Sequence, residues 1–281
     1  MKNFKCLMVT IALVSLACSK EDKPTIIYAK GYNMLLIGNS FFRPYAEHLN
    51  ELALDAGFEN HNATVIIKGG EGGWPISFWN NSTSAEHQEI KSVLDQGGVE
   101  FFGMTSGGDS TNRIEGHRAW INYALQNNPN ITIFIAIPQV DFPLDWDQRV
   151  EAYGFDTMEE FYHAFVNDLV NTEIVDQLRA EFPNTKIFSI PTGWASVHLA
   201  QMREDNTLLD TIGFMGPKAT SLFTDEKGHQ GQIIIETGTL IWLNSIYNVD
   251  LETHNYDTGF NTDLHEIAKN IMDNHDSNYK L

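Results

Sequence analysis

A serine that follows an apolar run is the first residue of this chain with clear chemical potential. Ser40 ends the sequence Gly38-Asn39-Ser40, directly after Met34-Leu35-Leu36-Ile37. In a parallel α/β sheet, ligands bind beyond the carboxyl ends of the strands, where the strand-to-helix loops lie. A helix N-terminus at such a loop stabilises negative charge that develops on a reacting oxygen. Ser40 is therefore a candidate nucleophile.

A serine hydroxyl is a weak nucleophile and needs a neighbouring base, usually a histidine that a carboxylate orients. A late segment of the chain supplies both residue types close together, as Asp225, Glu226 and His229. A loop this short brings an acid and an imidazole together without help from the rest of the fold. An early serine with a late acid and histidine indicates a serine hydrolase site.

At these positions the sequence resembles the SGNH (GDSL-like) hydrolases, a family of esterases and deacylases with a flavodoxin-like sheet. Leu35-Leu36-Ile37-Gly38-Asn39-Ser40-Phe41 resembles the family's first block, in the variant with Asn before the nucleophile. Asp225-Glu226-Lys227-Gly228-His229 resembles the last block. The resemblance implies that Ser40 is the nucleophile and that His229 is the general base.

Two residues compete for the role of the acid that orients His229. The family usually places this acid three residues before the histidine, where this chain has Glu226. Asp225 lies four residues before it. We favour Asp225, because the flexible backbone of Gly228 can absorb the additional residue, and Glu226 remains the alternative.

The resemblance also implies an oxyanion hole, in which N–H donors bind the charged oxygen of the reaction intermediate. One donor is expected from the backbone of Ser40. A second is expected from a glycine in Lys68-Gly69-Gly70-Glu71-Gly72-Gly73-Trp74, and we take Gly70 as the candidate. This run is not a phosphate-binding P-loop, because it lacks the Gly-Lys-Ser/Thr ending.

The loop after the third predicted strand departs from the family pattern. Asp109 stands where the family has an asparagine donor, and an ionised carboxylate would repel an oxyanion. We expect Asn112 to supply the donor, with Ser110 or backbone N–H groups as alternatives. Asp109 and Trp74 are candidates for substrate binding. The reason for Trp74 is that exposed aromatic side chains can stack on sugar rings.

Short apolar runs alternate with longer segments of helical period, which is typical of a parallel sheet with crossover helices. Strands are predicted at 33–37, 64–67, 100–105, 131–137 and 186–190. Helices are predicted at 45–56, 85–96, 115–126, 158–182 and 231–247. With the family resemblance, this pattern predicts one α/β domain over residues 32–281, a flavodoxin-like three-layer sandwich with a central parallel sheet of about five strands.

Three local features refine this assignment. Ser84 is expected to cap the helix at 85–96, and Thr157 with Glu160 forms a capping-box sequence at the start of the helix at 158–182. The segment 141–153 is rich in aromatic and acidic residues. We expect it to form a rim or a lid over the site.

The first residues resemble a bacterial lipoprotein signal. Lys2 and Lys5 precede an apolar run that is too short for a permanent membrane span, and Ser15-Leu16-Ala17-Cys18 resembles a relaxed lipobox. We predict a signal peptide at 1–17, an acylated Cys18 and a polar tether at 18–31. The protein is then lipid-anchored to the outer membrane and exposed at the cell surface.

Composition limits the partners and cofactors. The net charge of −19 disfavours nucleic acid, so contact with the membrane is expected only through the lipid. Cleavage before Cys18 leaves one cysteine, which excludes a disulfide within the chain. The histidines lack the close pairing of a zinc site, so no metal is expected, and no cofactor is implied. The oligomeric state is left open.

Together these observations predict a cell-surface serine esterase or deacylase. Its substrate is expected to be an acylated carbohydrate from which an acetyl group is removed, with lipid esters and acylated peptidoglycan as alternatives. The substrate class rests on family analogy and location. The alternative function is a non-catalytic surface lipoprotein of the same fold that binds glycan, which Asp109 and the altered acid spacing favour.

Overall fold

The computed structural model describes residues 29–108 and 112–281. The predicted signal peptide, Cys18 and most of the tether lie outside the described residues, and so do Asp109 and Ser110. Within the described part, no helix is both long enough and apolar enough to cross a membrane.

A five-stranded parallel sheet forms the centre of the protein. Its strands are β2 (Asn33–Gly38), β4 (Asn62–Ile67), β5 (Phe101–Thr105), β6 (Thr132–Ala136) and β7 (Ile187–Ile190). Their order across the sheet is β4-β2-β5-β6-β7, and every neighbouring pair is parallel. This is the flavodoxin-like order. The predicted α/β class and its five-stranded parallel sheet are confirmed.

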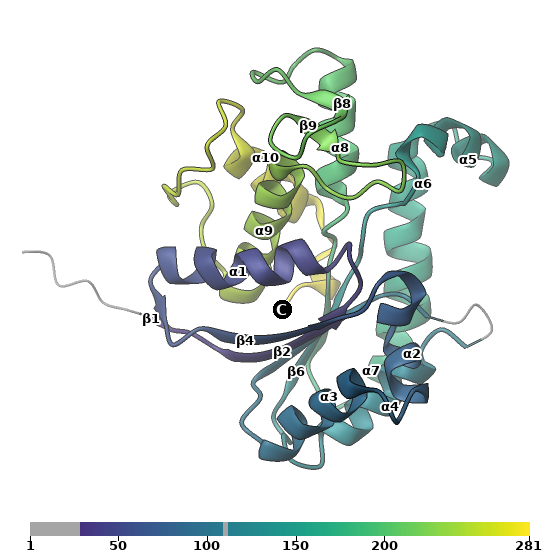
Figure 1. Cartoon of the computed structure of the whole chain (residues 1–281), viewed down its shortest axis with the longest axis vertical. Coiled ribbons are helices and arrows are strands. Elements are labelled where there is room, and N and C mark those ends of the chain that lie inside the picture. Colours follow the sequence, from purple (N-terminus) through teal and green to yellow (C-terminus); the bar gives the residue numbers. More distant parts are fainter. Residues whose placement is uncertain (1–28, 109–111) are drawn as a thin grey trace, which may run out of the picture.

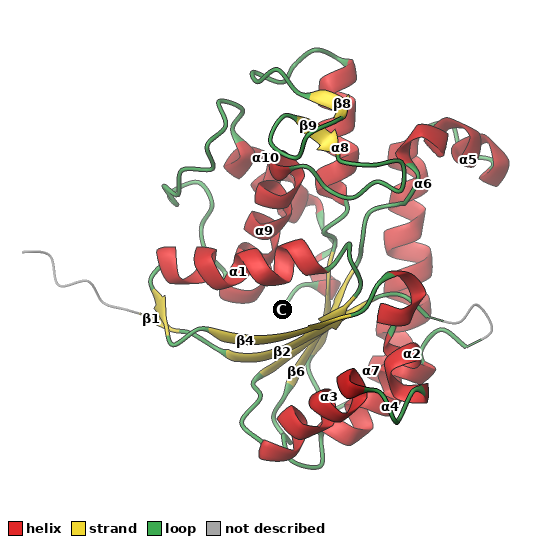
Figure 2. Cartoon of the chain, viewed as in Figure 1, coloured by secondary structure: helices red, strands yellow, loops and turns green. Residues whose placement is uncertain are grey.

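Helices cover both faces of the sheet, which explains why β5, β6 and β7 are buried along their whole length. One face is covered by α1 (Arg43–Asp55), α8 (Trp194–Glu204), α9 (Gln232–Tyr247) and α10 (Leu264–Asn274) (Figure 1). The other face is covered by α2 (Pro75–Asn80), α3 (Ala85–Gln96), α4 (Glu115–Ala124) and α7 (Gln177–Glu181). Figure 2 shows the strands as the middle layer.

Short elements complete the fold. Two further strand pairs are β1 (Ala29–Lys30) with β3 (Phe58–Glu59) and β8 (Gly213–Met215) with β9 (Ser221–Phe223). The segment predicted as a rim or lid forms a 3₁₀ turn at Pro143–Asp145 and then α5 (Trp146–Tyr153), which packs against α6 (Met158–Ala164). The sequence prediction missed α2, α8 and α10.

Local capping accounts for the starts of two helices. The Ser84 hydroxyl accepts a hydrogen bond from the backbone N–H of His87 at 3.2 Å, which confirms the predicted cap of α3. The Thr157 hydroxyl accepts from the N–H of Glu160 at 3.1 Å. The Glu160 carboxylate, however, accepts from the N–H of Asp156 instead of that of Thr157, so the predicted capping box forms only in part.

The predicted helix at 158–182 is continuous but not uniform. Between α6 and α7 the backbone forms a π-helix over Phe165–Asp176, whose wider turns correct the prediction of a single α-helix. A π-helix is rare and usually spans a single turn. Here Asn171, which is fully buried, accepts a hydrogen bond from the Ser189 hydroxyl on β7 at 2.7 Å.

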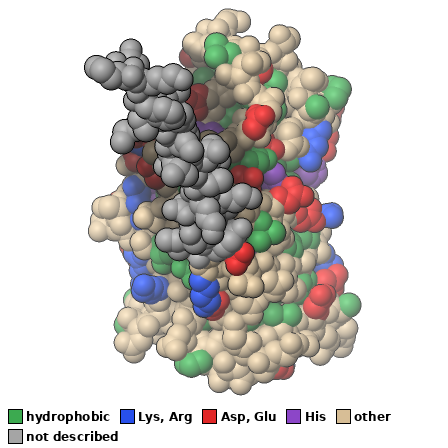
Figure 3. All heavy atoms as spheres, turned by 90° about the vertical axis from the view of Figure 1, so that its left-hand side faces the viewer, with side chains coloured by type: hydrophobic (Ala, Val, Ile, Leu, Met, Phe, Trp, Pro, Cys, Tyr) green, Lys and Arg blue, Asp and Glu red, His purple; other side chains and the backbone are tan. Residues whose placement is uncertain are grey.

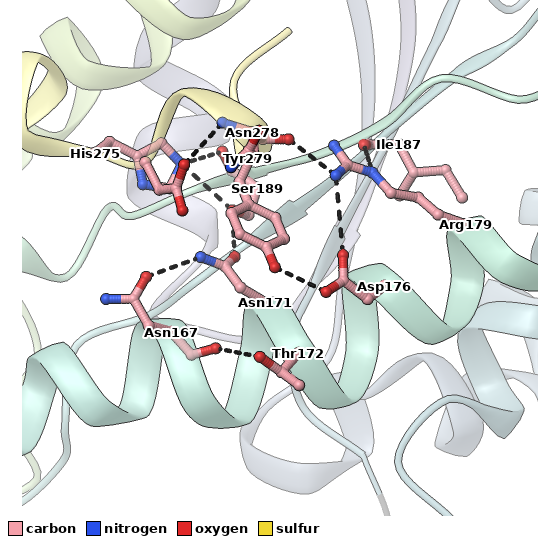
Figure 4. Close-up of polar contacts among 11 residues, drawn as sticks. Asn167, Asn171, Thr172, Asp176, Arg179, Ile187, Ser189, His275, Asn278 and Tyr279 are labelled. Atoms are coloured by element: carbon pink, nitrogen blue, oxygen red, sulfur yellow. Dashed lines mark hydrogen bonds and ion pairs between the residues drawn. The ribbon is translucent and has the colours of Figure 1, made fainter.

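The same network fixes the C-terminal residues against the sheet (Figure 4). The Nε2 atom of His275 lies 3.2 Å from the carbonyl oxygen of Ser189. Arg179 donates to the carbonyl oxygens of Ile187 at 2.8 Å and of Asn278 at 2.9 Å. Burial lowers the pKa of His275 to about 4. The ring is therefore neutral in the folded protein at neutral pH.

Most charged side chains lie on the surface, and Glu236, which is buried beside His48, is an exception. On the face shown in Figure 3, basic and acidic side chains are interspersed with hydrophobic ones. Most of the ion pairs among the described residues join partly exposed side chains, for example Arg43 with Glu47 at 2.7 Å. Such pairs contribute little stability, so the fold depends on its buried core.

Acid should destabilise the protein through His275. Its pKa rises to about 6.5 on unfolding, so the unfolded state binds more protons between pH 6.5 and pH 4, and stability falls as the pH falls through this window. His275 alone is expected to contribute a loss of about 3 kcal/mol of unfolding free energy between pH 7 and pH 4, in addition to the losses from the buried His61 and His117, whose pKa values are also lowered to about 4. Urea unfolding at several pH values should show a shallower pH slope for His275→Gln, whereas the exposed His163→Gln should keep the wild-type slope. Equal slopes for all three proteins would contradict this account.

Candidate active site

Ser40 lies on a tight turn between β2 and α1, at the carboxyl edge of the sheet. The Asn39 side-chain oxygen accepts hydrogen bonds from the N–H groups of Phe41 at 3.0 Å and Phe42 at 3.3 Å. This Asx turn leaves the half-buried Ser40 on its outer side. Among the described residues, none accepts a hydrogen bond from the Ser40 N–H. The turn lies where the strand order reverses between β2 and β5, which is the usual ligand position in this topology.

The structure brings together Ser40, His229 and Asp225. The Nε2 atom of His229 lies 2.8 Å from the Ser40 hydroxyl oxygen. The Nδ1 atom of the same ring lies 2.6 Å from an Asp225 carboxylate oxygen. With the proton on Nδ1, the imidazole donates to Asp225 and accepts from the Ser40 hydroxyl. This is the geometry by which a histidine removes the proton of an attacking serine.

The turn at Gly228 explains why Asp225 is the acid that contacts His229. Gly228 has a φ of +95°, which a residue with a Cβ atom rarely adopts. The second Asp225 carboxylate oxygen accepts from the N–H groups of Gly228 at 3.1 Å and His229 at 3.2 Å. The additional residue is absorbed in this turn. Glu226 is exposed, and its side chain makes no hydrogen bond to the described residues.

The charge of Asp225 is maintained by its neighbours. Partial burial acts to raise the pKa of this carboxyl, but hydrogen bonds from the His229 side chain and backbone and from Gly228 outweigh burial, so the pKa lies below its usual value. Asp225 is therefore ionised at neutral pH and can stabilise a protonated imidazole during reaction. The side chains of His229 and Asp225 are 33% and 48% exposed, so the site is open to water and substrate.

Two glutamines that the sequence analysis missed hold this loop in place. Gln139, in the segment after β6, is buried and donates from Nε2 to the carbonyl oxygen of Gly228. Gln230 is also buried and donates to the carbonyl oxygen of Phe41 at 2.8 Å, which joins the histidine loop to the serine turn. Their signal in the sequence is weak, because a lone glutamine beside apolar residues does not reveal its partner.

The glycine run after β4 approaches the serine turn at a different residue from the one expected. A Cβ atom on Gly73 would lie 2.7 Å from the Cα atom of Asn39 and 2.5 Å from the carbonyl oxygen of Gly38. A Cβ atom on Gly70 would meet nothing within 4 Å. Gly73 is thus the glycine of this run that packs against the turn carrying Ser40. The oxyanion role expected of Gly70 stays a prediction, with Gly73 as the glycine nearer to the turn.

The other predicted binding residues differ in whether they lie near Ser40. Trp74 is half-buried and lines a cavity of about 720 Å³ that also touches Asn39 and Phe41, on either side of Ser40. Asn112 is exposed and does not line this cavity. Asp109 lies outside the described residues, so its role in substrate binding stays a prediction. Ser106, on the loop after β5, lines the cavity where the family pattern places a donor-bearing loop.

Within residues 29–108 and 112–281, no group of three or more His, Cys, Asp or Glu side chains has the arrangement of a metal site. A larger cavity of about 1130 Å³ lies between α6, α8 and the end of α10. Ser40, His229 and Asp225 are absent from the lining of both cavities, but the chain neighbours of Ser40, Asn39 and Phe41, line the smaller one and not the larger one.

Comparisons with known proteins leave the family unassigned. No protein-family model matches the sequence, and a search of curated proteins finds no match. Among solved structures, the chain is similar to the periplasmic domain of a lipopolysaccharide acetyltransferase from Salmonella ser. Paratyphi A, with 15% identity, a TM-score of 0.41, and coverage of 79% of this chain and 85% of that chain. Similarity at this level carries no argument about function.

The hydrogen bonds predict unequal roles for the two neighbouring acids. Asp225→Asn would present an amide that cannot stabilise a charged imidazole and can favour the wrong tautomer, so kcat on an aryl acetate should fall by about 10³-fold or more. Glu226→Gln changes an exposed side chain and should leave kcat unchanged. The reverse result, with loss of activity only in Glu226→Gln, would show that Glu226 orients His229 in solution.

Proposed function

We propose that this protein is a serine ester hydrolase that removes acyl groups from carbohydrate. The observation that carries the proposal is the chain of contacts from the Ser40 hydroxyl through the His229 ring to Asp225, at 2.8 Å and 2.6 Å. The sequence resemblance to the SGNH hydrolases agrees with this arrangement.

The proposed reaction has two steps. The Ser40 oxygen attacks the ester carbonyl carbon while its proton moves to Nε2 of His229, and the protonated ring then gives this proton to the departing alcohol. The acyl group is left bound to Ser40 as an ester. Water next attacks the acyl carbon, loses a proton to His229, and releases the carboxylic acid as the proton returns to Ser40.

Backbone N–H groups are proposed to stabilise the oxyanion of both steps. The Ser40 N–H is one donor, since no described residue accepts from it. A glycine of the run Gly69–Gly73 is the second, with Gly73 favoured by its position against Asn39. Donors fixed in the backbone need little reorganisation during the reaction, which is the basis of their effect on rate.

The cellular setting is a proposal that rests on the N-terminal sequence. We infer that cleavage before Cys18 and acylation of its side chain anchor the protein to the outer membrane, with the domain at the cell surface. The lipid would then be the membrane contact of the domain, which would meet acylated carbohydrate outside the cytoplasm.

Ser40→Ala should abolish hydrolysis of a small aryl acetate, lowering kcat/KM by about 10³-fold or more, because the nucleophile is removed. Mass spectrometry of the wild-type protein should show an acyl group on the peptide that contains Ser40. Ser82→Ala, a change at an exposed serine, serves as the control and should retain activity.

Equal turnover by Ser40→Ala and wild type would eliminate Ser40 as the nucleophile. Absence of turnover in both, with binding to polysaccharide, would favour the glycan-binding alternative.

Cys18→Ala should move the protein from the membrane fraction to the soluble fraction, because it removes the acylated side chain. Fractionation followed by mass spectrometry of the N-terminal peptide measures both the location and the lipid. Retention of Cys18→Ala in membranes would contradict the anchor.

A further inference from the structure

Aromatic side chains form part of the wall of the cavity beside Ser40. It lies between the loops after β5 and β6 and the helix formed by α6 and the π-helix. Six aromatic side chains contribute to its lining: Phe41, Trp74, Tyr153, Phe155, Phe161 and Phe165. A volume of about 720 Å³ exceeds by far what an acetyl group fills, and it lies in the range of sites that enclose a larger organic group.

Two arginines in the cavity wall are already paired. Arg149 donates to Asp141 at 2.9 Å, and Arg113 lies 2.7 Å from Glu173. A sugar ring placed in this cavity would lose water from its hydroxyl groups and would have to compete for these paired side chains. Hydroxyl groups that are buried without partners are costly. The lining also includes the polar side chains of Ser106, Gln139 and Asp168. The part of the wall that favours the less polar side of an ester, which is the acyl group, is therefore the part formed by the six aromatic side chains.

The arrangement of the aromatic rings favours an aromatic acyl group over an aliphatic one. Phe161 meets Tyr153 at a ring-centre distance of 5.4 Å and Phe155 at 5.6 Å, with interplanar angles of 53° and 83°. Tilted and edge-to-face contacts of this kind are the preferred geometry of aromatic groups, and a further ring can join such a cluster. Tyr153 is 69% exposed, so part of the cluster is free to contact a ligand.

We propose that the acyl group carries an aromatic ring, which binds in this cavity while the alcohol remains outside it. This inference rests on the proposed hydrolase function and changes the expected acyl group from acetyl to a larger, ring-bearing one. The chemical class is an ester of an arylalkanoic or arylalkenoic acid. Ser40 is not itself part of the lining, but it lies between Asn39 and Phe41 in the chain, so its hydroxyl would attack the carbonyl carbon of an ester whose acyl group enters the cavity beside these two residues.

Three 4-nitrophenyl esters with the same leaving group test the proposal: the acetate, the 3-phenylpropanoate and the 3-cyclohexylpropanoate. The last two differ in the aromatic character of a ring of similar size, with similar reactivity at the carbonyl. For the purified protein, kcat/KM should be highest for the phenylpropanoate, by about tenfold over the cyclohexyl ester. Equal values for the two ring esters, or a preference for the acetate, would overturn the aromatic assignment while leaving the hydrolase intact. Hydrolysis of no ester would instead overturn the proposed function.

Variants at the cavity provide the second measurement. Tyr153→Ala removes one exposed ring of the lining and should lower the preference for phenylpropanoate over acetate, whereas Leu144→Ala, a similarly exposed side chain outside the lining, should keep the wild-type ratio. Ala164→Phe, which adds bulk to the cavity wall, should lower the same ratio further. Far-ultraviolet circular dichroism checks that each variant is folded. An unchanged ratio in both cavity variants would show that the acyl group binds elsewhere.

Discussion

The contact between His229 and Ser40 joins residues that are 189 positions apart in the chain. The contact requires α9, which follows His229 in the chain, to pack beside α1, which follows Ser40. α9 is buried on nearly all sides, and its Gly238 allows the ring of Tyr45 on α1 to lie against the helix backbone, where a Cβ atom would be only 2.2 Å from the ring. The core therefore sets the distance between the nucleophile and its base. A change that moved α9 would separate them without touching either residue.

The parts of the fold that the sequence predicted are those whose local pattern and tertiary environment agree. Strands such as β6 (Thr132–Ala136) are apolar along their length and are buried on both faces. The π-helix over Phe165–Asp176 could not be predicted, because its residues have ordinary helical preferences and its contact with the sheet, between Asn171 and Ser189, joins residues that are apart in the chain. α8 begins with small and polar residues such as Ala195 and Ser196, whose burial is decided by neighbouring helices.

In the candidate site, too, some features are visible in the local sequence and others are set by residues distant in the chain. The residue types of Ser40, Asp225 and His229 and the order in which they occur are visible in the sequence, and the structure brings these three side chains together. The choice between Asp225 and Glu226 depends on one backbone angle at Gly228, which spacing alone does not determine. In the same way, four neighbouring glycines look equivalent until packing places Gly73 against Asn39. Their catalytic roles remain proposals that activity measurements can test.

The electrostatics of the acid and the histidine fit a site that is open to solvent. The contact between His229 and Asp225, whose side chains are 33% and 48% exposed, would be weak by itself even with a protonated ring, since water screens the charges. The Asp225 carboxylate is nevertheless fixed, because its second oxygen accepts two backbone N–H groups from the turn that carries His229. The turn thus orients the acid locally, and Gln139 and Gln230 connect the turn to the sheet edge and the serine. The geometry of the site therefore comes from the backbone of the turn and its buried anchors, and depends little on the exposed side chains around it.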